Sequence, residues 1–79
     1  MDDTLPRLNT VFQDVFDDES INISRSTTAA TISAWDSVMH ITLMMAAERA
    51  FKVRFRSGDV AGLKNVGELI DLIDRLRKN

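Results

Sequence analysis

The amino-acid sequence predicts an all-α protein, a small four-helix bundle of three main helices and one short helix. In three separate segments, apolar residues recur at steps of three and four, which is the spacing of one face of a helix. One further segment, residues 52–56, alternates like a strand but has no second strand to pair with. With 79 residues and no cysteine, the chain is expected to form a single domain, residues 1–79, with a small core.

The first helix is expected from about Thr4 to Phe16. Thr4 is predicted to cap its start, and Pro6 is tolerated in the first turn because the amide that proline lacks has no intrahelical partner there. The acidic run 17–19 is expected to end the helix. Its apolar stripe consists of Leu5, Leu8, Val11, Phe12, Val15 and Phe16.

A long connection is expected over residues 17–35, which are rich in serine, threonine and asparagine. Ile21, Ile23 and Ile32 provide a few apolar anchors, and Trp35 is expected to pack against this loop or the last helix. Loops of this length are uncommon in small domains and are usually functional or mobile.

The second helix is expected from Asp36, a good N-cap, to about Phe51. Both of its faces are apolar, and such a helix is either deeply buried or offers one face to a partner. For Ile41, packing under the loop and exposure to a partner are equal alternatives. One face consists of Leu43, Met44, Ala47, Ala50 and Phe51, and the other of Val38, Ile41 and Met45.

After the second helix, residues 52–56 are expected to form an extended linker with Phe55 and Val53 turned inward. A short helix is predicted to begin at Ser57 or Asp59 and to reach Leu63. The last helix is predicted by a capping box, Asn65 with Glu68, and by basic residues that suit its C-terminal end. Its stripe is Val66, Leu69, Ile70, Ile73 and Leu76, and its terminal bases are Arg75, Arg77 and Lys78.

Charge is distributed unevenly along the chain. Residues 1–24 hold six acids against one base, whereas residues 49–79 hold eight bases against four acids. Such a distribution can orient a charged partner. The start of the chain lacks the features of a secretory signal, and no apolar stretch approaches the roughly 20 residues of a membrane span. We therefore expect a cytoplasmic, monomeric protein that does not bind nucleic acid.

The order of the elements and the residues Asp36-Ser37-Val38 resemble the acyl carrier protein family over essentially the whole chain. Members usually show Asp-Ser-Leu here, then a helix ending in an acidic cluster and Phe, a short third helix, and a last helix that opens with Thr-Val or a similar pair. Trp35 before this motif is similar to free-standing carriers of dedicated pathways. The other matching positions are Leu43, Glu48 and Phe51, residues 58–63, and Asn65, Val66 and Ile70.

The resemblance implies a carrier without catalytic activity of its own. A phosphopantetheinyl transferase would attach 4′-phosphopantetheine from coenzyme A to Ser37, and Asp36 would act as cap and as a contact for that transferase. The thiol of the arm, which the chain itself lacks, would hold acyl groups as thioesters for acyl-loading and acyl-processing enzymes. A peptidyl or aminoacyl carrier is the alternative within the family. Such carriers commonly have Gly before the motif, where this chain has Ala34-Trp35, which favours an acyl cargo.

The second helix departs from the acidic helix of many such carriers, because only Asp36 and Glu48 are acidic there. Partner docking is therefore expected to depend more on apolar side chains, and methionine adapts well to irregular apolar surfaces. A specialised fatty-acid, polyketide or related pathway is favoured. The expected partner-binding residues are Val38, Met39, Ile41, Met45, Glu48 and Arg49.

The same residues fit other functions less well. Ser37 and His40 share a helix face next to Asp36, but a bundle of this size lacks the cleft and oxyanion hole of a hydrolase, so His40 is expected to be a solvated residue. The basic and aromatic stretch 49–56 is expected to be mainly structural, with docking to an acidic enzyme patch as its alternative. One histidine and scattered carboxylates predict no metal site. A helical interaction module without a prosthetic group is the alternative from another class.

Overall fold

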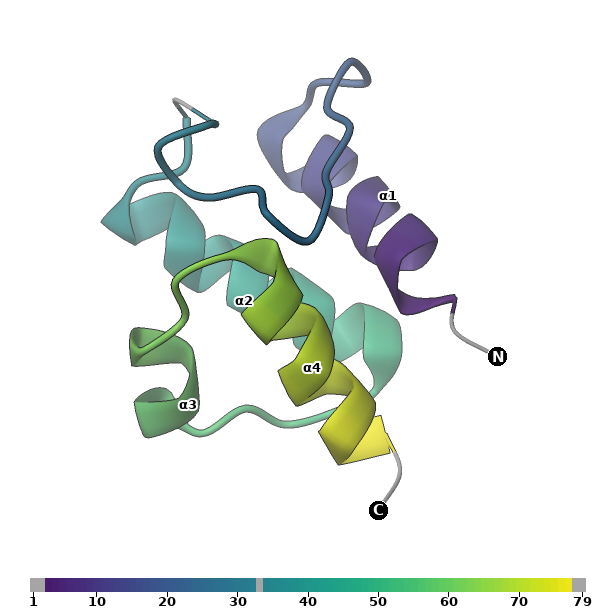
Figure 1. The fold of residues 1–79 in the computed structure, drawn as a ribbon, viewed down its shortest axis with the longest axis vertical. Coiled ribbons are helices and arrows are strands. Elements are labelled where there is room, and N and C mark those ends of the chain that lie inside the picture. The colour runs from purple at the N-terminus through teal and green to yellow at the C-terminus, as the bar shows by residue number, and fades with distance from the viewer. Residues whose placement is uncertain (1–2, 33, 78–79) are drawn as a thin grey trace.

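The computed structural model describes residues 3–32 and 34–77, and within them it contains four helices and no strand. These are α1 (Thr4–Phe16), α2 (Ser37–Phe51), α3 (Ser57–Ala61) and α4 (Val66–Arg77). Helix α1 packs against both α2 and α4, and the long loop from α1 to α2 runs across one end of the bundle (Figure 1). The predicted all-α bundle with one short helix and a long first connection is confirmed.

The core is formed by the three longer helices and one residue of the loop, Ile23, which is 5 % exposed. Phe12, Leu43 and Ile73 are among its fully buried side chains. Burying an aliphatic or aromatic side chain of this size stabilises a fold by about 1.5–3 kcal/mol. The remaining members are Leu8, Val11, Met44, Ala47, Phe51, Val66, Leu69 and Ile70.

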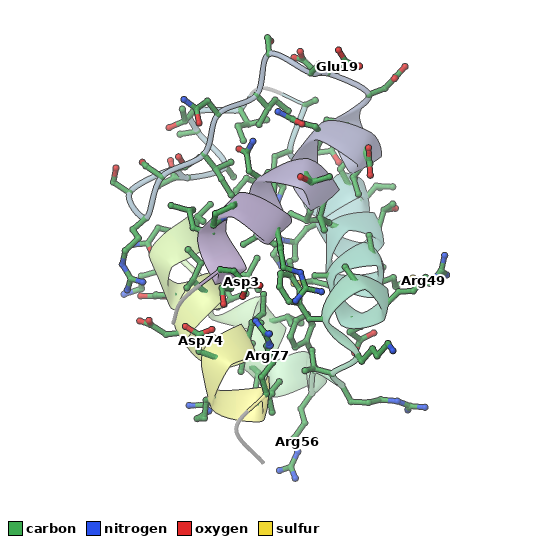
Figure 2. The ribbon with its side chains drawn as sticks, turned by 90° about the vertical axis from the view of Figure 1, so that its right-hand side faces the viewer. Asp3, Glu19, Arg49, Arg56, Asp74 and Arg77 are labelled. Carbon is green, nitrogen blue, oxygen red and sulfur yellow. The ribbon has the colours of Figure 1, made fainter. Side chains whose placement is uncertain are left out.

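The start of α1 differs from the prediction, whereas its end agrees with it. Thr4 does not cap the helix; it is the first helical residue, it is buried, and its hydroxyl donates a hydrogen bond to the carboxylate of Asp74. Arg77 donates to the same hydroxyl and pairs with Asp3 at 3.3 Å, so the start of α1 is tied to the end of α4 (Figure 2). The acidic run ends α1 as expected, with Asp17 in the left-handed conformation at φ 52°.

The first turn of α4 is capped, although one bond of the predicted capping box is displaced. The Asn65 side chain accepts from the backbone N–H of Glu68 at 2.9 Å, as predicted. The Glu68 carboxylate accepts from the N–H of Lys64, also at 2.9 Å, instead of the N–H of Asn65. Lys78, expected at the other end of this helix, lies outside the described residues.

The loop between α1 and α2 is bonded to the start of α4. The backbone N–H of Val66 donates to the carbonyl of Thr27, and that of Gly67 donates to the carbonyl of Arg25, both at 2.8 Å. The Arg25 guanidinium also meets the Asp71 carboxylate at 3.0 Å. Two amides at the free N-terminal end of α4 thus find partners in a segment more than 35 residues earlier in the chain.

Side chains of α1 hold the same loop from the other side. The Asn9 side chain accepts from the backbone N–H of Ile23 at 2.7 Å, and the Gln13 amide donates to the carbonyl of Ile21 at 3.0 Å. With Ile23 buried in the core, the loop has a fixed course despite its polar composition.

The linker after α2 was predicted to be extended over residues 52–56, but Lys52 is the left-handed C-cap of α2, at φ 57° and ψ 46°, while Arg56 has an extended backbone. Val53 and Phe55 are half-buried against the core, as predicted. The Glu48 carboxylate accepts from the backbone N–H of Phe55 at 2.6 Å. Helix α3 begins at Ser57, one of the two predicted starts, and ends at Ala61, two residues before the predicted end.

Candidate functional site

Ser37 is the first residue of α2, and Asp36 is the N-cap, as predicted. The Asp36 backbone is extended, at φ −113° and ψ −171°, and its carboxylate accepts from the N–H of Met39 at 2.9 Å. The Asp36 carbonyl accepts from the N–H of His40 at 2.8 Å, which begins the helical hydrogen-bond series. These bonds fix the direction in which α2 leaves the loop.

The side chain of Ser37 is exposed, and its hydroxyl has no hydrogen-bond partner within residues 3–32 and 34–77. The first amides of a helix have no partner in the helix itself, and the positive end of the helix dipole lies beside them. An anion attached at this hydroxyl would therefore meet a favourable electrostatic environment. The site can accept a covalent phosphate-linked group without opening the core.

The Trp35 ring packs on Phe12 of α1 and on His40 of α2. It meets the buried Phe12 ring edge-on, at 5.3 Å between centroids and 84°, and stacks on the His40 ring at 6.0 Å and 14°. The Trp35 indole N–H donates to Nδ1 of His40 at 3.0 Å. Nε2 of His40 lies 3.1 Å from the carbonyl oxygen of Val60. The segment just before Ser37 is thereby connected to α1, α2 and α3.

The expectation that His40 is a solvated residue is wrong, because both of its ring nitrogens are bonded within the protein. An indole N–H only donates and a carbonyl only accepts, so Nδ1 is the acceptor and Nε2 carries the proton. A general base would need a free nitrogen facing the Ser37 hydroxyl. The described residues therefore contain no hydrolase arrangement around Ser37.

One face of α2 is apolar and exposed. The exposed fractions of Val38, Ile41 and Met45 are 72 %, 63 % and 56 %, whereas Met39 is half-buried. This decides the open alternative for Ile41: the side chain faces solvent and does not pack under the loop. The opposite face supplies the core, so the all-round apolar character of α2 reflects two separate surfaces.

Glu48 and Arg49 are also among the expected partner-binding residues, and they differ from each other in exposure. Glu48 is half-buried and bonds the linker through Phe55, so it has a structural function in the fold. Arg49 is exposed and projects away from the bundle, as does Arg56 (Figure 2). Together with Lys52 and Arg54, they form a group of exposed bases that make no ion pair within the part of the chain the structure describes.

The aromatic members of the same stretch are structural, as expected. Phe51 is 5 % exposed, and the guanidinium groups of Arg7 and Arg77 lie 4.7 Å and 5.5 Å from its ring centroid. Arg7 also donates to the carbonyl of Ala50 at 2.9 Å. Phe51 is thus covered by cations of the protein itself.

The described residues contain no group of three or more histidine or acidic side chains placed to hold a metal ion. Within the same residues, no helix has the length and apolar character needed to cross a membrane.

Similarity to a solved structure agrees with this geometry. No protein-family model matches the chain, and no curated protein does. Among solved structures, the chain is similar to the holo acyl carrier protein from Geobacter metallireducens, solved by solution NMR. The identity is 45 % over 92 % of this chain and 84 % of that one, with a TM-score of 0.87. The chain belongs to the acyl carrier protein family, and its general function is therefore that of a carrier protein.

Proposed function

We propose that this protein carries acyl groups as thioesters on a 4′-phosphopantetheine arm attached to Ser37. The observation that supports this most strongly is the exposed, unbonded hydroxyl of Ser37 at the first position of α2. A serine that served only the fold at this position would be expected to cap the helix with its hydroxyl. Here the carboxylate of Asp36 already caps α2, so the Ser37 hydroxyl is left without a structural function.

The residues around Ser37 fit such a group. Attachment would form a phosphodiester at the Ser37 oxygen, break the phosphoanhydride bond of coenzyme A and release adenosine 3′,5′-bisphosphate. The resulting negative charge at an exposed helix N-terminus is favourable by about 0.3–1 kcal/mol. Because the chain has no cysteine, the arm would provide the thiol that binds the cargo.

The test is incubation of the protein with coenzyme A and a broad-specificity phosphopantetheinyl transferase, followed by intact mass measurement. The expected result is a gain of one phosphopantetheine that Ser37→Ala abolishes. Ser57→Ala is the matched control, because Ser57 is also the first residue of a helix, α3, and its replacement should leave the gain intact. A folded protein that gains no mass would reject the proposal and favour an interaction module without a prosthetic group.

Partner enzymes, including the transferase, are proposed to dock on the exposed apolar face of α2 next to Ser37. The three exposed side chains there would be desolvated in a complex, which is the usual source of binding energy at an interface centre. A specialised pathway and an acyl, not aminoacyl, cargo remain our proposals, based on Trp35 and on the few acids of α2. We also propose that the carrier is cytoplasmic and monomeric, and light scattering tests the second point.

A further inference from the structure

The end of the long loop, just before α2, is attached to the helices through Trp35. The backbone N–H of Trp35 donates to the carbonyl of Ile32 at 3.0 Å, which is a bond within the loop itself. Ala34 is exposed, whereas the Trp35 side chain is half-buried and its ring meets the buried ring of Phe12 on α1. The position of the residues that precede the Asp36 cap therefore depends on what holds the Trp35 ring.

His40 holds that ring from α2. It lies three residues after Ser37, and side chains of a helix lean toward the N-terminal end, so the imidazole covers the first turn. Its Nδ1 accepts from the indole N–H of Trp35 at 3.0 Å, and the two rings are stacked at 14°. A tryptophan side chain has one donor and no acceptor. The bond to His40 therefore uses the whole hydrogen-bonding capacity of the Trp35 side chain.

The other ring nitrogen of His40 is bonded to α3. Nε2 donates to the carbonyl oxygen of Val60 at 3.1 Å, in the last turn of this five-residue helix. Which ring nitrogen of a histidine carries the proton is set by the bond that the other nitrogen makes. With the proton on Nε2, Nδ1 has the lone pair that the indole N–H of Trp35 needs. The bond to α3 thus fixes the tautomer of His40 that can hold Trp35.

The attachment reaction requires a fixed geometry at Ser37, which is the first residue of α2, where helices fray. In that reaction the Ser37 oxygen attacks the pantetheine-side phosphorus of coenzyme A, and adenosine 3′,5′-bisphosphate leaves with the electrons of the broken P–O bond. The hydroxyl proton goes to a base of the transferase, because both ring nitrogens of His40 are already bonded. The reacting atoms have to be aligned.

A loosely held segment before α2 would leave only a fraction of the carrier molecules in the arrangement that the transferase binds. The apparent dissociation constant rises in inverse proportion to that fraction. A bond that keeps the segment in place therefore acts on the affinity of the transferase for the carrier, even though it does not touch the reacting atoms.

We propose that His40 is a positioning residue for the attachment of the arm and that it acts through Trp35. Nδ1 of His40 holds the indole, the indole ring holds the end of the loop against Phe12, and the bond of Nε2 to α3 keeps the imidazole in place. The inference depends on the proposed attachment at Ser37. It assigns a function in that reaction to two side chains that neither carry the arm nor belong to the exposed apolar face of α2.

The experiment measures kcat and KM for the carrier with coenzyme A and a broad-specificity phosphopantetheinyl transferase, at a temperature where circular dichroism shows each variant to be folded. His40→Leu removes both bonds of the imidazole, and Trp35→Phe keeps an aromatic ring but removes the indole N–H. Each should raise KM by about two- to tenfold, the effect of one hydrogen bond, and leave kcat within about twofold. The double variant should be no worse than the single ones, because both changes remove the same bond.

His40→Asn separates positioning from the loss of the ring. The asparagine side-chain oxygen can replace Nδ1 as the acceptor for the indole N–H, so KM should stay within about twofold of its value in the unaltered protein. Ile73→Val is the control for stability alone. It removes one methylene group from the buried core on α4 and takes no part in the bonds of Trp35 or His40, so KM should not change.

Four results would overturn the inference. These are an unchanged KM in His40→Leu and Trp35→Phe, an equal rise in Ile73→Val, a loss in His40→Asn as large as in His40→Leu, or losses that multiply in the double variant. None of them affects the attachment itself, which the gain in mass at Ser37 decides. An unaltered protein that gains no phosphopantetheine overturns both proposals.

Discussion

Replacing Gly67 with alanine should detach the loop from α4. A Cβ atom at this position would lie 2.9 Å from the backbone carbonyl oxygen of Arg25, closer than Cβ atoms come to other atoms in proteins. That oxygen is also the acceptor of the Gly67 N–H at 2.8 Å. Because the neighbour is backbone and not a flexible side chain, the loop has to move.

The magnitude follows from the bonds that would be disturbed. The loop contributes two backbone hydrogen bonds to the start of α4, at Val66 and Gly67, each worth about 0.5–1.5 kcal/mol net. Alanine gains up to about 1 kcal/mol over glycine in a helix interior, and less in the first turn. The loss outweighs the gain, so Gly67→Ala should lower the free energy of unfolding by about 1–2 kcal/mol.

Urea unfolding followed by far-ultraviolet circular dichroism measures this change as a lower midpoint at unchanged slope. The matched control is Gly58→Ala inside α3, where a Cβ atom would meet nothing within 4 Å, and stability should stay equal or rise by up to about 1 kcal/mol. If Gly67→Ala is as stable as the unaltered protein while Gly58→Ala behaves as expected, the account of the loop contact is wrong.

Three further changes test other parts of the structure. His40→Ala removes both bonds of the ring, so stability should fall by about 1–3 kcal/mol and Trp35 fluorescence should shift as its indole N–H turns to water; unchanged emission would contradict the stacked geometry. Ser20→Ala removes a hydroxyl that donates to the Asp18 carboxylate, so the pKa of Asp18 should rise toward its ordinary value of 3.8, measured by carboxyl ¹³C titration. The pKa of Asp18 is lower in the folded protein than in the unfolded one, so ionised Asp18 stabilises the fold fully above its unfolded pKa. This stabilisation is lost as pH falls through the folded pKa. The difference in stability between the unaltered protein and Ser20→Ala should be lost over the same pH range. Ile41→Ser should change the free energy of unfolding by less than about 0.5 kcal/mol, since the side chain is 63 % exposed, and a larger loss in urea unfolding would place it in the core.

The helices were predictable because their evidence is local. The spacing of apolar residues and the caps at Asp36 and Asn65 depend on neighbours in the sequence, and both caps are confirmed. Thr4 shows the limit of such reasoning: as a helix-start threonine it is a good cap, but Asp74, 70 residues away, takes its hydroxyl. Local preference yields where a tertiary partner takes the side chain.

The surroundings of Ser37 were only partly predictable. Its place at the start of α2 follows from sequence, whereas the bonds of His40 depend on Val60 being brought next to it by α3. The two faces of α2 show the same limit, because a helix that is apolar all round does not reveal which side faces the core. The fixed course of the loop was missed because it depends on long-range bonds, such as that of Ile23 to Asn9.

Part of the uneven charge along the chain becomes an uneven charge in space, although Asp3 of the acidic first segment pairs with Arg77 of the basic last one. Glu19 and Arg56 lie at opposite ends of the molecule (Figure 2), whose longest extent is 33 Å. At physiological salt, the field of an exposed charge decays over about 8 Å, so an approaching enzyme senses one end at a time. An encounter would begin with rotation of the molecule in that field, and raising the salt concentration should slow productive approach without changing the final complex.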